Sequence, residues 1–331
     1  MPTNTLVIQT AFPGDAILTL PLLQKIKELE PDQKLGVIAI PSTKSIFEAS
    51  PSVDEVFVLD KRGDHKKLRD VNKFAKQFVK HGYNKIITPH RSLRTALLVY
   101  FSGIKDSTGF SNSALPFVFN KQIKYDKNSH EVKRDLSLIG YTGEWRIRPI
   151  INISEDKASG IRERVKSIGD KIAVIAPGSV WETKKYPESY FAKLIREMSE
   201  GNYNIVTVGG VSDRELCDRI IRESGVSANN LAGEYSIPET VEVLKNCDLI
   251  ISNDSAPAHM GVAAGIKVYT IYCSTVPAFG FYPYGEKDKS IGLDDLRCKP
   301  CGIHGYKKCP ESHFNCGNNL TPQTVVSKIF S

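Results

Sequence analysis

The chain has 331 residues, of which 41% are hydrophobic and 24% charged, which is typical of folded globular proteins rather than disordered ones. This length fits two domains of about 150 residues better than one. No apolar run approaches the roughly 18–20 residues that a membrane span needs. The first ten residues also lack the basic head and apolar stretch of a secretory signal, so we expect a cytoplasmic protein.

The net charge of +7 is unevenly distributed. Residues 1–150 hold 23 Lys and Arg against 15 Asp and Glu, whereas residues 151–331 hold 21 against 22. Such one-sided positive charge favours an anionic partner, such as a phosphorylated lipid or a membrane surface, although an ordinary solvated surface explains it equally well. Basic motifs interleaved with aromatic residues are missing, so we expect no nucleic-acid partner.

Short apolar runs alternate with segments of helical spacing throughout the chain. In the first half the predicted strands are 5–9, 35–40, 56–59 and 85–88, and the predicted helices include 17–29 and 68–80. The pattern restarts after residue 150, with predicted strands 171–176, 204–208, 248–252 and 267–272 and predicted helices 190–198, 213–223 and 258–264.

This alternation predicts an α/β fold with two Rossmann-like parallel-sheet domains, residues 1–150 and 151–331, facing a cleft. Residues 141–160, which contain Gly, Pro and mixed charge, are the predicted linker.

The first candidate catalytic segment follows strand 5–9, where Pro13-Gly14-Asp15 begins a helix. A carboxylate at this position can accept a proton from a hydroxyl group. Asp15 can equally be the helix N-cap, a position that Asp favours. The loop has no G-x-G-x-x-G, which argues against a dinucleotide site.

Two loops of the second half are suited to phosphate. The first, Pro177–Pro187, combines a Gly178-Ser179 turn with Lys184 and Lys185. A plain strand–helix loop with solvated lysines is the alternative.

The other loop, Asn253–His259, joins a buried strand to a helix of small residues. The N–H groups of Ser255 and Ala256 would point at an anion at the positive helix end, with Asp254 holding the loop and His259 about one turn inside. The alternative is a well-capped helix with a hydrogen-bonded histidine.

The order of these motifs resembles glycosyltransferase family 9, the bacterial heptosyltransferases. The resemblance lies in P-G-D-(x)5-P at Pro13–Pro21, P-G-S-x-W-x-x-K-K-Y-P at Pro177–Pro187 and N-D-S-A-P-A-H at Asn253–His259, and it extends over essentially the whole chain. It implies a GT-B fold in which the N-terminal domain binds the acceptor and the C-terminal domain binds the nucleotide-sugar. It further implies inverting transfer of heptose from ADP-heptose to an acidic lipopolysaccharide inner-core acceptor, without a catalytic cofactor or metal.

The resemblance also assigns residues. Asp15 matches the family's general base and Lys184 its donor-contacting lysine. The donor site is expected to comprise Gly178, Ser179, Lys184, Gly209, Asp254, Ser255, Ala256 and His259.

The segment Pro89–Arg94 resembles the family's acceptor-binding segment. The expected acceptor residues are His90, Arg91, Ser92 and Arg94, because arginines can grip carboxylates or phosphates in bidentate fashion. A glycolipid acceptor implies peripheral contact with the cytoplasmic face of the inner membrane. A second basic run, comprising Lys61, Arg62, Lys66, Lys67 and Arg69, is interpreted as a solvated face, with a phosphate site as the alternative.

Four of the seven cysteines cluster near the C-terminus in the pattern C-x2-C-x7-C-x6-C, at Cys298, Cys301, Cys309 and Cys316. Four thiolates can hold a structural zinc or iron ion. Reduced thiols in a compact loop are the alternative, since disulfides are disfavoured in the cytoplasm.

Other functions stay open. The chain can be a transferase that uses another nucleotide-sugar or a protein acceptor, a sugar epimerase, or a non-catalytic nucleotide-sugar-binding protein. The presence of both Asp15 and Lys184 argues against the non-catalytic alternative.

Overall fold

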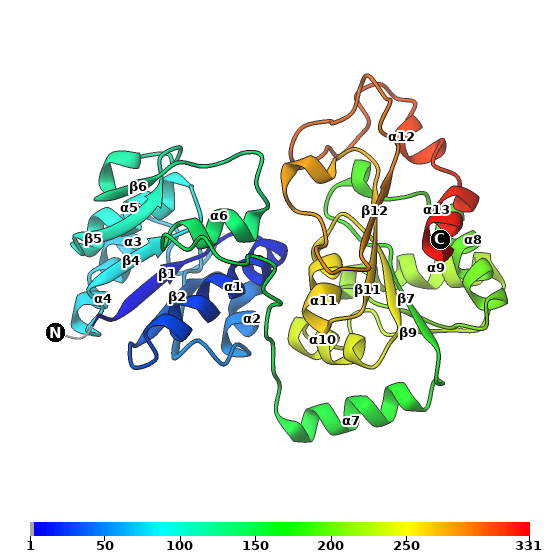
Figure 1. Cartoon of the computed structure of the whole chain (residues 1–331), viewed down its shortest axis with the longest axis horizontal. Coiled ribbons are helices and arrows are strands. Elements are labelled where there is room, and N and C mark those ends of the chain that lie inside the picture. The colour runs from blue at the N-terminus through cyan, green and yellow to red at the C-terminus, as the bar shows by residue number, and fades with distance from the viewer. Residues whose placement is uncertain (1–2) are drawn as a thin grey trace. The chain divides into compact units, whose positions relative to one another are not determined.

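The computed structural model describes residues 3–331, and these form two compact units that divide between Asn152 and Ile153 (Figure 1). The division predicted from the sequence falls two residues earlier, after residue 150. Each unit contains one six-stranded sheet in which every neighbouring pair of strands is parallel.

The sheet of the first unit has the strand order β3-β2-β1-β4-β5-β6. Its strands are β1 Thr5–Ile8, β2 Leu35–Ala39, β3 Glu55–Val58, β4 Lys85–Thr88, β5 Asp106–Phe110 and β6 Lys121–Ile123. Its helices are α1 Pro13–Leu29, α2 Lys44–Glu48, α3 Leu68–Ala75, α4 Gln77–Lys80, α5 Leu93–Ser102 and α6 Glu131–Ser137. Among these helices, α1 packs with α2 and α6, whereas α3 and α4 pack with α5.

The sheet of the second unit has the order β12-β11-β10-β7-β8-β9, which repeats the topology of the first. Its strands are β7 Ile172–Ala176, β8 Asn204–Thr207, β9 Ala228–Asn230, β10 Leu249–Asn253, β11 Lys267–Tyr272 and β12 Lys289–Gly292. Its helices are α7 Glu155–Lys166, α8 Glu188–Glu200, α9 Arg214–Ser224, α10 Ile237–Lys245, α11 Ala256–Ala264, α12 Asn315–Asn318 and α13 Pro322–Phe330.

In both sheets the strand order reverses between two neighbouring strands, β1 and β4 in the first unit and β7 and β10 in the second. Successive crossovers leave such a pair toward opposite faces of the sheet, so the loops at their carboxyl ends diverge and leave room for a ligand. The loops that the sequence singled out follow these strands.

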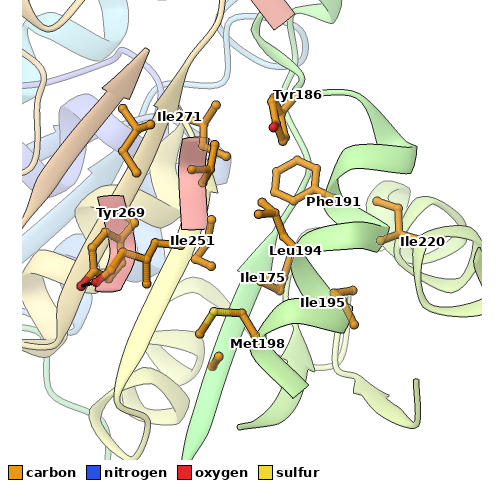
Figure 2. Close-up of a cluster of buried hydrophobic side chains, with 14 of the residues drawn as sticks. Ile175, Tyr186, Phe191, Leu194, Ile195, Met198, Ile220, Ile251, Tyr269 and Ile271 are labelled. Atoms are coloured by element: carbon orange, nitrogen blue, oxygen red, sulfur yellow. Dashed lines mark hydrogen bonds between the residues drawn. The ribbon is translucent and has the colours of Figure 1, made fainter. Parts of the chain in front are cut away.

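In the core of the second unit, alternate residues of the strands pack against residues spaced about one helical turn apart on a helix (Figure 2). Ile175, Ile251 and Ile271 come from the neighbouring strands β7, β10 and β11 and point to one face of the sheet. Helix α8 packs on this face through residues spaced i, i+3, i+4 and i+7, which are Phe191, Leu194, Ile195 and Met198. Burial of each such side chain contributes about 1.5–3 kcal/mol.

All eight predicted strands coincide with observed ones, but four strands were not predicted. Strand β5 reads DSTGF, β6 reads KQI and β9 reads ANN, so none of the three has an apolar run. Strands β6, β9 and β12 lie at sheet edges, where one side of the strand has no neighbour to bury it.

The helical predictions differ at two places. The single helix expected over 68–80 is interrupted at Lys76, between α3 and α4. Helix α7 begins inside the predicted linker. The sequence did not indicate this helix, because its buried face is narrow and consists only of Ala158, Ile161 and Val165. No helix within residues 3–331 is long and apolar enough to cross a membrane.

Candidate active site

The first candidate catalytic residue lies in the first turn of α1. The N-cap of this helix is Phe12, Pro13 is the first helical residue and Asp15 is the third. The structure therefore excludes Asp15 as the N-cap. Its carboxylate lies at the positive end of the helix dipole, which favours its ionised form.

Hydrogen bonds of Gln9 and Thr19 fix the turn that carries Asp15. The Gln9 amide donates to Oγ1 of Thr19 over 2.8 Å and accepts from the Ala11 N–H over 3.2 Å. The Thr19 hydroxyl in turn donates to the main-chain oxygen of Asp15 over 2.9 Å. The β1–α1 loop and the start of α1 are thus held together by buried polar side chains.

The expected acceptor segment adjoins this loop, because β4 is the neighbour of β1. Nδ1 of His90 lies 2.9 Å from Oγ1 of Thr10 and 2.8 Å from Oγ1 of Thr95. Ser92 is the N-cap of α5 and accepts from the Thr95 N–H. Burial, together with the positive charges of Lys61 and Arg91, lowers the pKa of His90 to about 4, so the ring is neutral at pH 7.

Three cationic side chains lie in or beside this segment, and two of them, Arg91 and Arg94, were expected from the sequence. Arg91 stacks over the ring of Tyr125 at 4.0 Å, and Arg94 donates to the main-chain oxygen of His65 over 2.6 Å. The third is Lys61, whose ammonium donates to the Thr10 oxygen over 2.7 Å.

Lys61 therefore does not belong to a solvated face. Burial and the positive charge of Arg94 lower its pKa. Its position just after the carboxyl end of β3 was the signal available in the sequence, since ligand-binding residues of parallel sheets gather at that edge.

In the second unit Asn253, at the end of β10, holds the loop that follows β7. The Asn253 amide donates to the Pro177 oxygen over 2.7 Å and accepts from the Tyr186 N–H over 2.9 Å. The side chain is completely buried. The loop 177–187 is thereby tied to the start of α11.

Within that loop Lys184 pairs with Asp254. The ammonium lies 2.7 Å from Oδ2 of Asp254 and donates to its main-chain oxygen over 3.1 Å. Thr275 donates to the same carboxylate oxygen over 2.7 Å. An ammonium has three hydrogens, so one hydrogen of Lys184 is not used by Asp254.

The start of α11 has the features of an anion site. Ser255 is the N-cap, but its side chain does not cap the helix. Its hydroxyl oxygen lies instead 3.3 Å from the Gly178 oxygen and 3.4 Å from the Asn253 oxygen. His259 is 5% exposed, and its Nδ1 has no hydrogen-bond partner within the described residues. Burial lowers the pKa of His259 to about 4, so the ring is neutral.

Gly178 and Gly209 are required by close packing. A Cβ atom on Gly178 would lie 2.6 Å from the carboxyl group of Asp213, and one on Gly209 would lie 2.7 Å from Cβ of Asp213. Ser179 accepts from the Trp181 N–H. These contacts keep the loops after β7 and β8 close together.

The expectation of a metal at the four C-terminal cysteines is not supported. In residues 3–331 no three His, Cys, Asp or Glu side chains come together in a way that could hold a metal ion. All seven cysteines are free thiols. Cys316 is buried in the hydrophobic core, and the Cys301 thiol donates to the Cys298 oxygen over 3.1 Å.

The cysteine-rich segment packs on the loop of Lys184 instead. Thr183 donates its N–H to the Tyr306 oxygen over 3.1 Å and accepts from the Tyr306 N–H over 2.8 Å. The Cys301 N–H donates to the Ser274 oxygen, next to Thr275. The segment thus supports the residues around Asp254.

Comparisons with known proteins connect this geometry to a family. The profile of glycosyltransferase family 9 (heptosyltransferase) matches residues 71–310. A lipooligosaccharide heptosyltransferase 2 of Campylobacter jejuni is 30% identical over 165 residues, which are 49% of this chain and only 51% of the relative, about half its length. The lipopolysaccharide heptosyltransferase 2 of Escherichia coli is 22% identical over 98% of this chain and 97% of its own.

Among solved structures, the E. coli ADP-heptose lps heptosyltransferase II superposes with a TM-score of 0.80 at 21% identity, over 99% of this chain and 98% of that one. This similarity, with the two parallel sheets, confirms the predicted α/β fold class as GT-B. Because the family profile covers most of the chain, the protein belongs to glycosyltransferase family 9 (heptosyltransferase), a family of glycosyltransferase enzymes.

Proposed function

We propose that this protein transfers heptose from ADP-heptose to an acidic lipopolysaccharide inner-core acceptor, with inversion at the anomeric carbon. The names of its relatives support the donor and acceptor classes. The observation that carries the proposal is the arrangement at the strand-order reversal of the second unit. There Lys184 and the start of α11 offer positive charge and N–H donors around Asp254.

On the donor side, the remaining hydrogen of Lys184 and the first turn of α11 would bind the diphosphate. Both groups stabilise the negative charge that grows on ADP as the bond to the anomeric carbon breaks. Asp254 keeps the ammonium in place. The neutral ring of His259 can donate or accept a hydrogen bond at the same helix start.

The proton is handled by Asp15. The acceptor hydroxyl oxygen attacks the anomeric carbon from the face opposite ADP, its hydrogen moves to the Asp15 carboxylate, and ADP leaves with the bonding electrons. The position of Asp15 in the first turn of α1 favours the carboxylate that this step needs.

The acceptor would bind to the first unit. His90, Arg91, Ser92 and Arg94 lie beside the β1–α1 loop, and Lys61 adds a fifth polar group there. Three cations near one loop suit an acceptor that carries phosphate or carboxylate groups. The excess positive charge of residues 1–150 acts in the same direction.

Peripheral membrane contact is part of the proposal, since the acceptor is a lipid. Leu93 and Tyr100 are seven residues apart on α5 and both exposed, and Phe117 is exposed on the short 3-10 helix that packs against α5. Exposed apolar side chains such as these can insert into the interface of a bilayer.

The test is to measure ADP release from ADP-heptose with and without a heptose-free lipid acceptor. We expect release that depends on the acceptor. Asp15→Asn should lower turnover by about 10²–10⁴-fold, because the proton acceptor is lost, while donor affinity stays unchanged. Donor binding without turnover would show a non-catalytic protein, and an active Asp15→Asn enzyme would exclude Asp15 as the base.

A further inference from the structure

Beneath the turn that carries Asp15 lies a second carboxyl group, that of Asp135 on α6. Asp135 is 1% exposed. Its Oδ2 is in hydrogen-bond contact with Oγ1 of Thr19 at 3.1 Å, and its Oδ1 has no hydrogen-bond partner within residues 3–331. A buried carboxylate with a single partner is energetically costly, whereas a buried carboxylic acid is much less so.

The hydrogen atoms at Thr19 indicate which form is present. A hydroxyl group has one hydrogen and two lone pairs. Gln9 donates to this hydroxyl, because its amide orientation is set by the Ala11 N–H that its oxygen accepts. The main-chain oxygen of Asp15 can only accept, so it takes the single hydrogen of Thr19. The lone pair that remains faces Asp135, and the hydrogen of this contact must therefore come from Asp135.

The surrounding charges agree with a neutral Asp135. Arg134 forms its ion pair with Glu131, and it also donates to the Tyr125 hydroxyl and to the main-chain oxygens of Asp126 and Lys127. Burial raises the pKa of Asp135 well above its usual value, and the carboxylates of Glu131 and Asp15 raise it further. The Thr19 contact and the charge of Arg134 oppose this change.

We propose that Asp135 is a neutral carboxylic acid at pH 7 that donates its hydrogen to Thr19 and thereby positions the first turn of α1, which carries Asp15. Asp135 is a positioning residue, since it acts through Thr19. Its neutral state also keeps a second negative charge away from Asp15. The functional part of this inference rests on the proposed role of Asp15 as the base.

The protonation state can be measured without any assay of activity. The infrared difference spectrum of wild type minus Asp135→Asn at pH 7 should contain the C=O stretch of a protonated carboxyl group. Asp126→Asn is the matched control, because hydrogen bonds from Ser129 and Asn128 lower the pKa of Asp126 and its substitution should remove only carboxylate bands. Absence of the protonated band for Asp135 would overturn the proposal.

Kinetics test the positioning role. The side-chain amide introduced by Asp135→Asn can donate to Thr19 as the acid does, so this variant should keep turnover within about threefold of wild type. The acid limb of its pH profile should stay in place, since no charge has been removed. Thr19→Val removes the shared hydroxyl and should lower turnover about 10- to 100-fold at unchanged donor affinity, because Asp15 is displaced.

Two results would contradict the positioning role. One is a loss of turnover in Asp135→Asn as large as in Thr19→Val, and the other is a shift of its acid limb. If Thr19→Val does not fold, the infrared band still tests the protonation state of Asp135, and the pH profile of turnover in Asp135→Asn still tests its positioning role. An active Asp15→Asn enzyme would refute the proposed function, whereas the infrared result would stand independently of it.

Discussion

Lys184 illustrates how a single side chain acquires a role from its surroundings. The sequence offers two adjacent lysines in the same loop, Lys184 and Lys185. In the structure Lys184 is largely buried and paired with Asp254 at 2.7 Å. Lys185 pairs instead with Glu182 at 2.5 Å, three residues away in its own loop. The two residues therefore form a matched pair for testing the donor site.

We expect Lys184→Met to lower turnover by about 10²–10³-fold, because the growing charge on the diphosphate loses a cation. ADP affinity should fall as well. Lys185→Met should change neither quantity, since an exposed ion pair of this kind contributes about 0–1 kcal/mol. Steady-state kinetics and ADP titration of the two variants check this, and equal effects in both would remove Lys184 from the proposed mechanism.

At the scale of elements, the donor site depends on how closely the loops after β7 and β8 approach each other. Asp213 accepts from the Gly210 N–H over 2.9 Å and fills the space beside Gly178 and Gly209. Any Cβ at Gly178 would push this carboxyl group out of its hydrogen bond. The glycine is thus required by tertiary packing, because its own backbone has no positive φ.

Gly178→Ala should lower the free energy of unfolding by about 1–3 kcal/mol through overpacking, and it should weaken donor binding. Gly160→Ala is the control, since a Cβ there meets nothing within 4 Å and lies inside helix α7. It should raise stability by about 0.5–1 kcal/mol. Denaturant titration distinguishes the two, and a Gly178→Ala protein as stable as wild type would show that Asp213 can move aside.

At the scale of the whole molecule, each unit contains a neutral histidine, His90 in the first and His259 in the second. Each has a pKa of about 4 in the folded chain, whereas the unfolded chain titrates at about 6.5. As the pH falls below about 6.5, the unfolded chain binds protons first. The free energy of unfolding that depends on these two neutral histidines is therefore fully present above that pH and is lost progressively toward pH 4.

We expect the melting temperature to fall between pH 7 and pH 5, where most carboxylates stay ionised. The melting temperature of His259→Gln should fall less steeply over this range, because one proton-linked group is gone. In the wild type, protonation of His259 in the unfolded chain lowers the free energy of unfolding by up to about 3 kcal/mol at pH 4. Calorimetry at several pH values measures this. Parallel curves for wild type and variant would mean that His259 titrates normally in the folded protein.

The sequence by itself determined the two α/β halves, the eight strands with apolar runs and the order of the motifs. These features are local, since the spacing of apolar residues along a short segment predicts a buried strand or the buried face of a helix. The loops of Asp15, Lys184 and Asp254 could therefore be identified from the motifs and the apolar runs beside them. The polar strands β5, β6 and β9 could not, because only pairing with a neighbouring strand makes them strands.

Only the tertiary structure decided which of these residues meet. The strand order places the His90 segment beside the β1–α1 loop, the loop after β3 brings Lys61 to Thr10, and the packing of α6 against α1 buries Asp135. Within residues 3–331 the structure brings no three His, Cys, Asp or Glu side chains, the C-terminal cysteines included, together in a way that could hold a metal ion. Contacts between residues far apart in the chain depend on packing and burial, which the spacing of a sequence does not record.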